Sequence, residues 1–191
     1  MPDPDPLDLA TRAGLPDALR VLLERHPRPG WEADPHFDGL TRFWLDRHLM
    51  FRRLQDALAA ETRASLDRAA DPRTAAGRIG RLARTLVGEL DGHHRIEDLH
   101  YFPLLAAAEP RLAAGFALLD RDHHALHGAL ERLADRTNAA LRGLLARPAE
   151  PAPLGALESE LAGFSRLLDR HLTDEEELVV PVVLEHPGVA G

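Results

Sequence analysis

Four long stretches of this chain repeat apolar residues at alternating steps of three and four, the spacing of helices that bury one face. The clearest stretch covers about 154–185, where the buried face is expected to hold Leu157, Leu161, Phe164, Leu168, Leu178 and Val182. Similar patterns predict helices over about 34–67, over about 72–107, and from "EPRLAAG" to about 146. Nothing in the sequence has the pattern of a strand. The pattern therefore predicts an all-α protein.

Proline and glycine separate these stretches into a simple order of elements. The connections "DPRTAAG" and "RPAEPAP" are short, and short connections between long helices make neighbours antiparallel. We therefore expect an antiparallel up-down-up-down four-helix bundle. Before it, "LPDALRVLLERHP" predicts a short amphipathic helix and "PRPGWEADP" a linker. The expected organisation is an N-terminal extension with a short helix over 1–30, the bundle over 31–187 and a tail over 188–191.

Polar residues interrupt each apolar face in one zone. The stretches "HHRIEDLHYFP" and "HLTDEEELVVP" both begin with His, carry acids four and five residues later, and end with Pro. A two-helix unit used twice would produce such a repeat. The polar residues that keep the phase of their helices are His48, His93, Glu97, His123, His127, His171 and Glu175.

These residue types at this spacing indicate metal chemistry. Residues four apart on a helix lie roughly 6 Å apart on one face, so a His–Glu pair reaches one point beside the helix. Four such helices bring five imidazoles and two carboxylates into one interior volume. Buried carboxylates without partners are costly, and bound cations are the natural compensation. Imidazole and carboxylate without thiolate suit iron, manganese or zinc.

A count of ligands sharpens this expectation. Two carboxylates among five imidazoles suit a two-metal centre in which the carboxylates bridge the ions. Two six-coordinate ions offer about twelve positions, and five imidazoles, two bridging carboxylates and one bridging oxo or hydroxo group fill all but one. The open position predicts a small ligand such as dioxygen, peroxide or nitric oxide, and not a large substrate.

Several neighbouring residues leave alternatives open. Glu175 keeps the phase of its helix and is preferred to Glu176 as the bridging acid, although both remain candidates. His94 and His124 fall one step out of phase and are interpreted as flanking residues, while His100 borders the buried face. Cleavage of an O–O bond needs a proton donor. The candidate donors near the expected site are Tyr101, His94, His100 and His124.

Composition narrows the classes of function. A formal net charge of −8 argues against a general nucleic-acid or anionic-membrane surface. The chain has no cysteine, which excludes disulfides, zinc–thiolate sites, iron–sulfur clusters and thiol catalysis. The acidic, proline-rich start is unlike a signal peptide, and no apolar run approaches the roughly 20 residues of a membrane span. We expect a cytoplasmic protein with no nucleic-acid or membrane partner; composition indicates no oligomeric state.

At its His and Glu motifs the chain resembles the hemerythrin-like family, the HHE cation-binding domain. The resemblance covers roughly 31–187 and rests on His48, "HHRIED" with its trailing "YFP", "DHHALH", and "HLTDEE" with its trailing Pro181. It implies a four-helix bundle around a non-haem di-iron centre that cycles between Fe2+ and Fe3+. The implied ligands are His48 and His93 on one iron, His123, His127 and His171 on the other, and Glu97 with Glu175 or Glu176 as bridges.

The resemblance implies a range of functions, from oxygen binding and sensing to iron handling, peroxide or nitric oxide chemistry, and repair of iron–sulfur clusters. Repair proteins of this family carry an N-terminal cysteine region, which is missing here. The leading hypothesis is a di-iron protein that binds dioxygen or a related small molecule. The first alternative is a di-iron enzyme that degrades hydrogen peroxide or turns over nitric oxide. The second is an iron-responsive structural or regulatory bundle.

Overall fold

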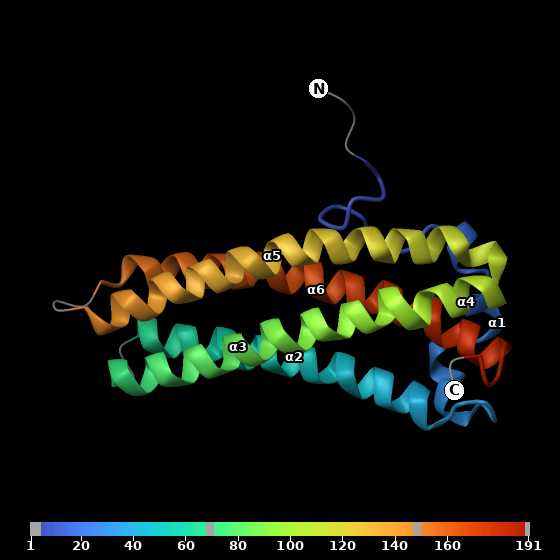
Figure 1. The fold of residues 1–191 in the computed structure, drawn as a ribbon, viewed down its shortest axis with the longest axis horizontal. Coiled ribbons are helices and arrows are strands. Elements are labelled where there is room, and N and C mark those ends of the chain that lie inside the picture. The colour runs from blue at the N-terminus through green and yellow to red at the C-terminus, as the bar shows by residue number, and fades with distance from the viewer. Residues whose placement is uncertain (1–4, 68–70, 147–149, 190–191) are drawn as a thin grey trace. The chain divides into compact units, whose positions relative to one another are not determined.

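The computed structural model describes residues 5–67, 71–146 and 150–189, and every regular element among them is helical (Figure 1). The four long helices are α2 (Gly39–Leu66), α3 (Pro72–Ile96), α5 (Ala113–Leu145) and α6 (Ala152–Glu185). Their bounds lie close to the four predicted stretches, and the predicted all-α class is confirmed. The antiparallel order of the four helices stays a prediction.

Short elements fill the connections. The predicted short N-terminal helix is split into a 3-10 turn, η1 (Asp17–Leu19), and α1 (Val21–Arg25). The predicted linker forms a second 3-10 turn, η2 (Arg28–Ala33), which buries the indole of Trp31. A third, η4 (Pro110–Leu112), precedes α5.

The chain divides into two compact units. Unit 1 takes the N-terminal residues up to Leu49, together with His93–Ala125 and the residues from Asp169 onwards. Unit 2 takes Met50–Gly92 and Leu126–Leu168. Each of the four long helices contributes a segment to both units. Every in-phase polar residue of the expected site except His127 falls in unit 1.

The apolar core of unit 1 includes residues from the N-terminal part of the chain. Its buried members come from the N-terminal segment as well as from the long helices, because Leu15 and Leu22 pack in the same cluster as Phe116 and Leu178. A smaller cluster joins Trp31 of η2 with residues near the end of α6, namely Val180 and Leu184. The N-terminal segment is therefore part of the packed core of unit 1.

Unit 2 buries the apolar faces predicted for its helices. Phe51, Leu58, Ile79, Leu86, Leu157, Leu161 and Phe164 are all fully or almost fully buried. Gln55, the polar residue on the predicted face of α2, donates from Nε2 to the carbonyl of Leu161 at 3.2 Å. Unit 2 is thus a conventional helical core.

A π-helical turn changes the inner face of the second helical stretch. It is η3 (Glu97–Tyr101), which joins α3 to α4 (Phe102–Ala108). Pro103 lies in the first turn of α4, where its missing N–H and its ring disfavour a regular turn before it. A π-turn adds one residue to the helical register. An uninterrupted α-helical register from His93 and Glu97 predicts Leu104 on the inner face, and this is wrong: Leu104 is 51% exposed, and Phe102 and Leu105 are buried in its place.

Among the described residues, no single helix is long and apolar enough to cross a membrane, and one bent pair, Pro72–Ala108 with Pro110–Leu145, has the length and composition only when the two are joined.

Candidate metal centre

Four helical stretches of unit 1 direct histidine and glutamate side chains to a common interior. They form two groups whose potential ligand atoms lie within 4.8 Å of one another inside each group. The first group, group A, is His48, His93, Glu97 and Glu175. The second, group B, is His94, His123 and His171. The two groups together contain five imidazoles and two carboxylates, which is the predicted count.

Both glutamates reach across from group A to group B. Glu97 places Oε1 at 2.8 Å from Nε2 of His93 and Oε2 at 3.6 Å from Nε2 of His123. Glu175 places Oε1 at 3.2 Å from Nε2 of His48 and Oε2 at 3.3 Å from Nε2 of His171. Each carboxylate thus offers one oxygen to each group, which is the arrangement of a bridging ligand.

Many inward-facing atoms have no hydrogen-bond partner among the residues that the structure describes. They are both carboxylate oxygens of Glu97, Oε2 of Glu175, and Nε2 of His94, His123 and His171. All belong to side chains that are buried. Oε1 of Glu97 is close to Nε2 of His93, at 2.8 Å, but the contact does not have the geometry of a hydrogen bond. Buried polar groups are normally paired, and a cluster of unpaired ones calls for an explanation such as an ion. These donor atoms fit a cation bound by nitrogen and oxygen ligands.

Three of the histidines contact a carboxylate with the ring nitrogen that faces away from the centre. Nδ1 of His123 lies 2.7 Å from Asp98 and Nδ1 of His48 lies 3.1 Å from Glu176, both as hydrogen bonds, whereas Nδ1 of His171 faces Asp122 at 3.5 Å without forming a hydrogen bond. A ring that donates Nδ1–H outward leaves Nε2 as an inward lone pair. Metal-binding histidines commonly have such outer partners, which fix the tautomer and the ring orientation.

Burial keeps three of the rings in the neutral form that metals bind. It lowers the pKa of His93 to about 3. It also lowers the pKa of His123, and together with the nearby His123 and His171 it holds the pKa of His94 well below its usual range. The rings of His94 and His123 stack at 4.0 Å between centroids, a contact that suits neutral rings.

Two other side chains of the cluster, His48 and Glu97, carry protons that a cation would replace. Although burial opposes charge, the Glu175 carboxylate raises the pKa of His48 to about 9. Burial and the charge of Glu175 hold the pKa of Glu97 well above its usual range. Protons on His48 and Glu97 thus compensate the interior charge when no cation does so, and a metal bound to this cluster would release them.

Trp44 of α2 holds one of the bridging carboxylates. Its Nε1–H donates to Oε1 of Glu175 at 2.6 Å, and its ring packs against Tyr101 at 4.9 Å between centroids. The indole is buried and the phenol ring is partly buried beside the carboxylate. The arrangement encloses the cluster within apolar surface.

The structure corrects the predicted placement of two histidines. The side chain of His127 is 61% exposed and lies near Asp91 and Glu131, each at 3.4 Å, and it belongs to neither group. His94, which was expected on the flank, is buried in group B instead. The cause is helical phase: α5 continues from His123 to the buried Leu126 by a step of three, so a step of four points outward.

The other candidates divide clearly. Glu175 lies within group A, whereas Glu176 contacts the outer nitrogen of His48. His100 and His124 are exposed, and Nδ1 of His124 contacts a carbonyl of its own helix. Whether the clustered residues bind metal stays a prediction that the geometry supports.

Sequence reasoning missed several residues around the cluster. Asp122 and Asp174 are buried, although a run of acids such as the one that contains Asp174 is typical of a solvated helix face. Both pair with Arg12, which is buried and lies 110 and 162 residues away in sequence. No local pattern could reveal such a distant partner. The burial of Asp122 was easier to expect. Asp122 directly precedes His123 on α5, and this helix buries two adjacent positions in each turn here.

Comparison with known proteins gives one match. Residues 39–188 match the family model described as the hemerythrin HHE cation binding domain. Neither the curated proteins nor the solved structures include a match to this chain. The matched range contains both groups of the cluster and leaves out the N-terminal segment.

Proposed function

Because this chain belongs to the hemerythrin HHE cation-binding domain family, we propose that unit 1 binds two non-haem iron ions and uses them to bind dioxygen or a related small molecule. Group A would hold one ion and group B the other. Glu97 and Glu175 would bridge them, since each offers one oxygen to each group. This reach of both carboxylates across the two groups is the observation that carries the proposal.

Iron suits this donor set, and when bound it supplies a redox-active centre with affinity for small diatomic molecules. The residues of the chain do the rest. His123, His48 and His171 are held with Nε2 inward by Asp98, Glu176 and Asp122. Manganese and zinc can use the same ligands, so metal competition belongs to the test.

The surroundings of the cluster favour binding over turnover. Of the four candidate proton donors, His100 and His124 are exposed and belong to neither group. His94 is itself a member of group B, and Tyr101 packs on Trp44. Of the four candidates, Tyr101 alone is left beside the cluster as a proton donor for cleavage of an O–O bond. Binding of an intact small molecule is therefore the function we propose first.

The test is to load the metal-free protein anaerobically with ferrous iron and then admit oxygen. The proposal predicts a near-ultraviolet absorption band that appears with oxygen and disappears when oxygen is removed. A spectrum that does not respond to oxygen would contradict it. Oxygen evolution from hydrogen peroxide, compared with free iron at equal concentration, distinguishes the enzyme alternative: a rate well above that of free iron would support turnover instead.

A further inference from the structure

Two arginines of the N-terminal segment, defined here as residues 5–33, contact the carboxylates that lie behind the metal-site histidines. Arg12 contacts Asp122, the outer partner of His171. Arg28 contacts Glu176, the outer partner of His48. One arginine thus stands behind each of the two groups, and both arginines lie before the range that matches the family.

Arg12 is inserted into the interior. Its side chain is 1% exposed, and its guanidinium donates Nη1 to Oδ1 of Asp122 and Nε to Oδ2 of Asp174, each at 2.8 Å, with a further contact from Nη2 to Asp122. The planar guanidinium holds a carboxylate through two parallel contacts and so fixes its orientation. Asp122 is thereby held facing Nδ1 of His171 at 3.5 Å.

The segment around Arg12 is tied down by the helices on which it lies. Arg170 of α6 donates to the carbonyl of Ala13 at 2.7 Å and also contacts Asp174. Arg121 of α5 donates to the carbonyl of Leu7 at 2.9 Å. Arg12 is therefore presented from a fixed backbone.

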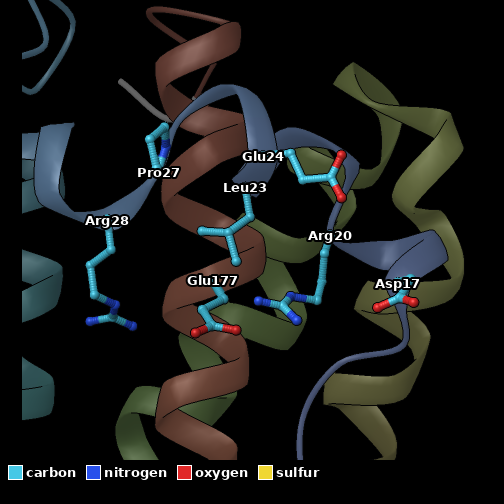
Figure 2. A pocket seen from close by; sticks show the side chains of 7 residues that line it. All are labelled: Asp17, Arg20, Leu23, Glu24, Pro27, Arg28 and Glu177. Atoms are coloured by element: carbon cyan, nitrogen blue, oxygen red, sulfur yellow. The ribbon is translucent and has the colours of Figure 1, made fainter.

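Arg28 reaches the site from η2 at the surface. Its Nη1 donates to Oε2 of Glu176 at 2.7 Å, while Oε1 of Glu176 faces Nδ1 of His48 at 3.1 Å. The Arg28 side chain is 45% exposed and lines a surface cavity of about 370 Å³. Figure 2 shows Arg28 and Arg20 on either side of Glu177 at this cavity. Arg28 also lies over the ring of the buried Trp31 at 4.6 Å, so a change at Arg28 alters the surface and this one contact with the core.

These contacts have a physical consequence for the histidines. An anionic carboxylate behind an imidazole raises the basicity of its inner nitrogen and fixes its orientation, and loss of such a partner weakens metal binding. A guanidinium behind that carboxylate keeps it anionic and in place, and adds positive charge close to the centre. Without Arg12, the buried Asp122 and Asp174 would repel each other, which would displace Asp122 from His171.

We propose that the N-terminal segment tunes the metal centre through two positioning residues. Arg12 holds Asp122 against His171, and Arg28 holds Glu176 against His48. These contacts set the affinity for iron and the reduction potential of the bound iron. The proposal rests on the proposed function, that unit 1 binds iron. It gives a segment outside the matched family range a role in the chemistry of the site.

The experiment compares the full-length wild-type protein with Arg12→Gln, Arg28→Gln and the matched control Arg25→Gln. Arg25 lies in the same segment, is exposed, and pairs with Glu185 at 2.7 Å. Affinity for ferrous iron is measured by competition with a chromophoric chelator, and the midpoint potential of the bound iron by redox titration. Folding of each metal-free variant is checked by circular dichroism.

We expect Arg12→Gln and Arg28→Gln each to weaken iron binding by about 10- to 100-fold, the effect of losing an outer partner of a metal-binding histidine. Both changes remove a positive charge near the iron. This loss favours the ferric state, so both changes should lower the midpoint potential. Arg25→Gln should match the wild type in both measurements. Arg28→Lys should recover most of the affinity, because the contact with Glu176 needs one donor, whereas Arg12→Lys should not, because Arg12 contacts two carboxylates.

Wild-type affinity and potential in both Arg12→Gln and Arg28→Gln would overturn the proposal. If Arg12→Gln does not fold, iron binding by Asp122→Asn is measured in its place. This variant keeps an acceptor for Arg12 and removes the charge that faces His171. Weakened iron binding in Asp122→Asn supports the proposal, and unchanged binding overturns it. A wild-type protein that binds no iron would overturn the proposed function as well, whereas unaffected variants of an iron-binding wild type overturn this proposal alone.

Discussion

In three histidines of unit 1, the two ring nitrogens have different roles. In His48, His123 and His171, Nδ1 faces a carboxylate and Nε2 faces the interior. The outer contact selects the tautomer, so the inner nitrogen is available as a ligand. The quality of the centre therefore depends on residues that do not touch a metal.

The cluster contains His94 in the place predicted for His127, and this difference gives the sharpest prediction for single residues. His94→Ala should remove one ligand from group B and reduce the iron content of the loaded protein by about one ion per chain. His127→Ala should keep the wild-type content, because that ring is exposed and lies outside both groups. Metal analysis by mass spectrometry measures both. Full iron content in His94→Ala with a loss in His127→Ala would restore the ligand set implied by the resemblance.

The protonation of His48 predicts how the stability of the metal-free protein varies with pH. Burial opposes the charge, but Glu175 raises the pKa of His48 from 6.5 to about 9, so protonation favours the folded state. This contribution is fully present below pH 6.5 and is lost as the pH rises through 9. The melting temperature of the metal-free protein should fall over this range.

Thermal denaturation of the wild type and of His48→Gln, both metal-free, checks this dependence. His48→Gln has no such titrating group, so its melting temperature should change less between pH 6.5 and 9. A melting temperature that changes equally in both proteins would show that other groups control the dependence.

Most of the site residues could be predicted at this scale, and the misses have physical reasons. His48, His93, Glu97, His123, His171 and Glu175 all lie in the cluster, because spacing on a helix largely determines which side chains share a face. The prediction placed His127 on the inner face by a step of four from His123, whereas the inner face continues through Leu126 by a step of three. Arg12 was beyond prediction, because its partners are distant in sequence and no periodicity connects them.

At the scale of elements, the π-helical turn η3 begins at the bridging Glu97. The turn carries Asp98, the partner of His123, and changes the phase of the buried residues that follow it. π-turns are often found at functional sites, where an added residue costs stability and re-aims side chains. Pro103 indicates a disturbed helix at this place, but a proline alone does not distinguish a kink from a π-turn.

Deletion of Leu99, which is exposed within η3, tests the role of this turn. Removing one residue should convert the stretch to a continuous α-helix with Phe102 and Leu105 still inside, so the metal-free protein should fold with little loss of stability. Iron binding should weaken, because Glu97 and Asp98 lose their positions. Chemical denaturation and chelator competition measure the two effects.

The matched control deletes Asn138, an exposed residue of the regular helix α5. This deletion shifts buried residues such as Ala140 out of phase, so it should destabilise the protein without a direct effect on the cluster. A Leu99 deletion that destabilises as much as the Asn138 deletion would show that η3 is required for packing.

At the scale of the whole molecule, the two units differ in what stabilises them. Unit 2 buries a conventional apolar core, whereas unit 1 contains the cluster of two carboxylates and five imidazoles in addition to its apolar clusters. A ligand that binds only the folded state stabilises it, and here that effect belongs to unit 1. The division into units follows from contacts distant in sequence, which the pattern of single helices does not reveal.

Removal of the metal should therefore loosen unit 1 selectively. Amide hydrogen exchange should become faster around His93–Ala125 and the last part of α6 in the metal-free protein, and it should change little in Met50–Gly92. Local opening of this kind is what hydrogen exchange measures. Equal protection of both units with and without metal would show that the cluster does not contribute to folding.

The central claim is that Glu97 and Glu175 join two groups of ligands into a two-iron centre. Native mass spectrometry of the anaerobically iron-loaded protein, after removal of loosely bound metal, tests this claim most directly, with the Glu97→Ala/Glu175→Ala double variant beside the wild type. The account predicts two irons per chain in the wild type and loss of both in the double variant. A wild type that retains no iron or one iron, or a double variant that retains two, would contradict it.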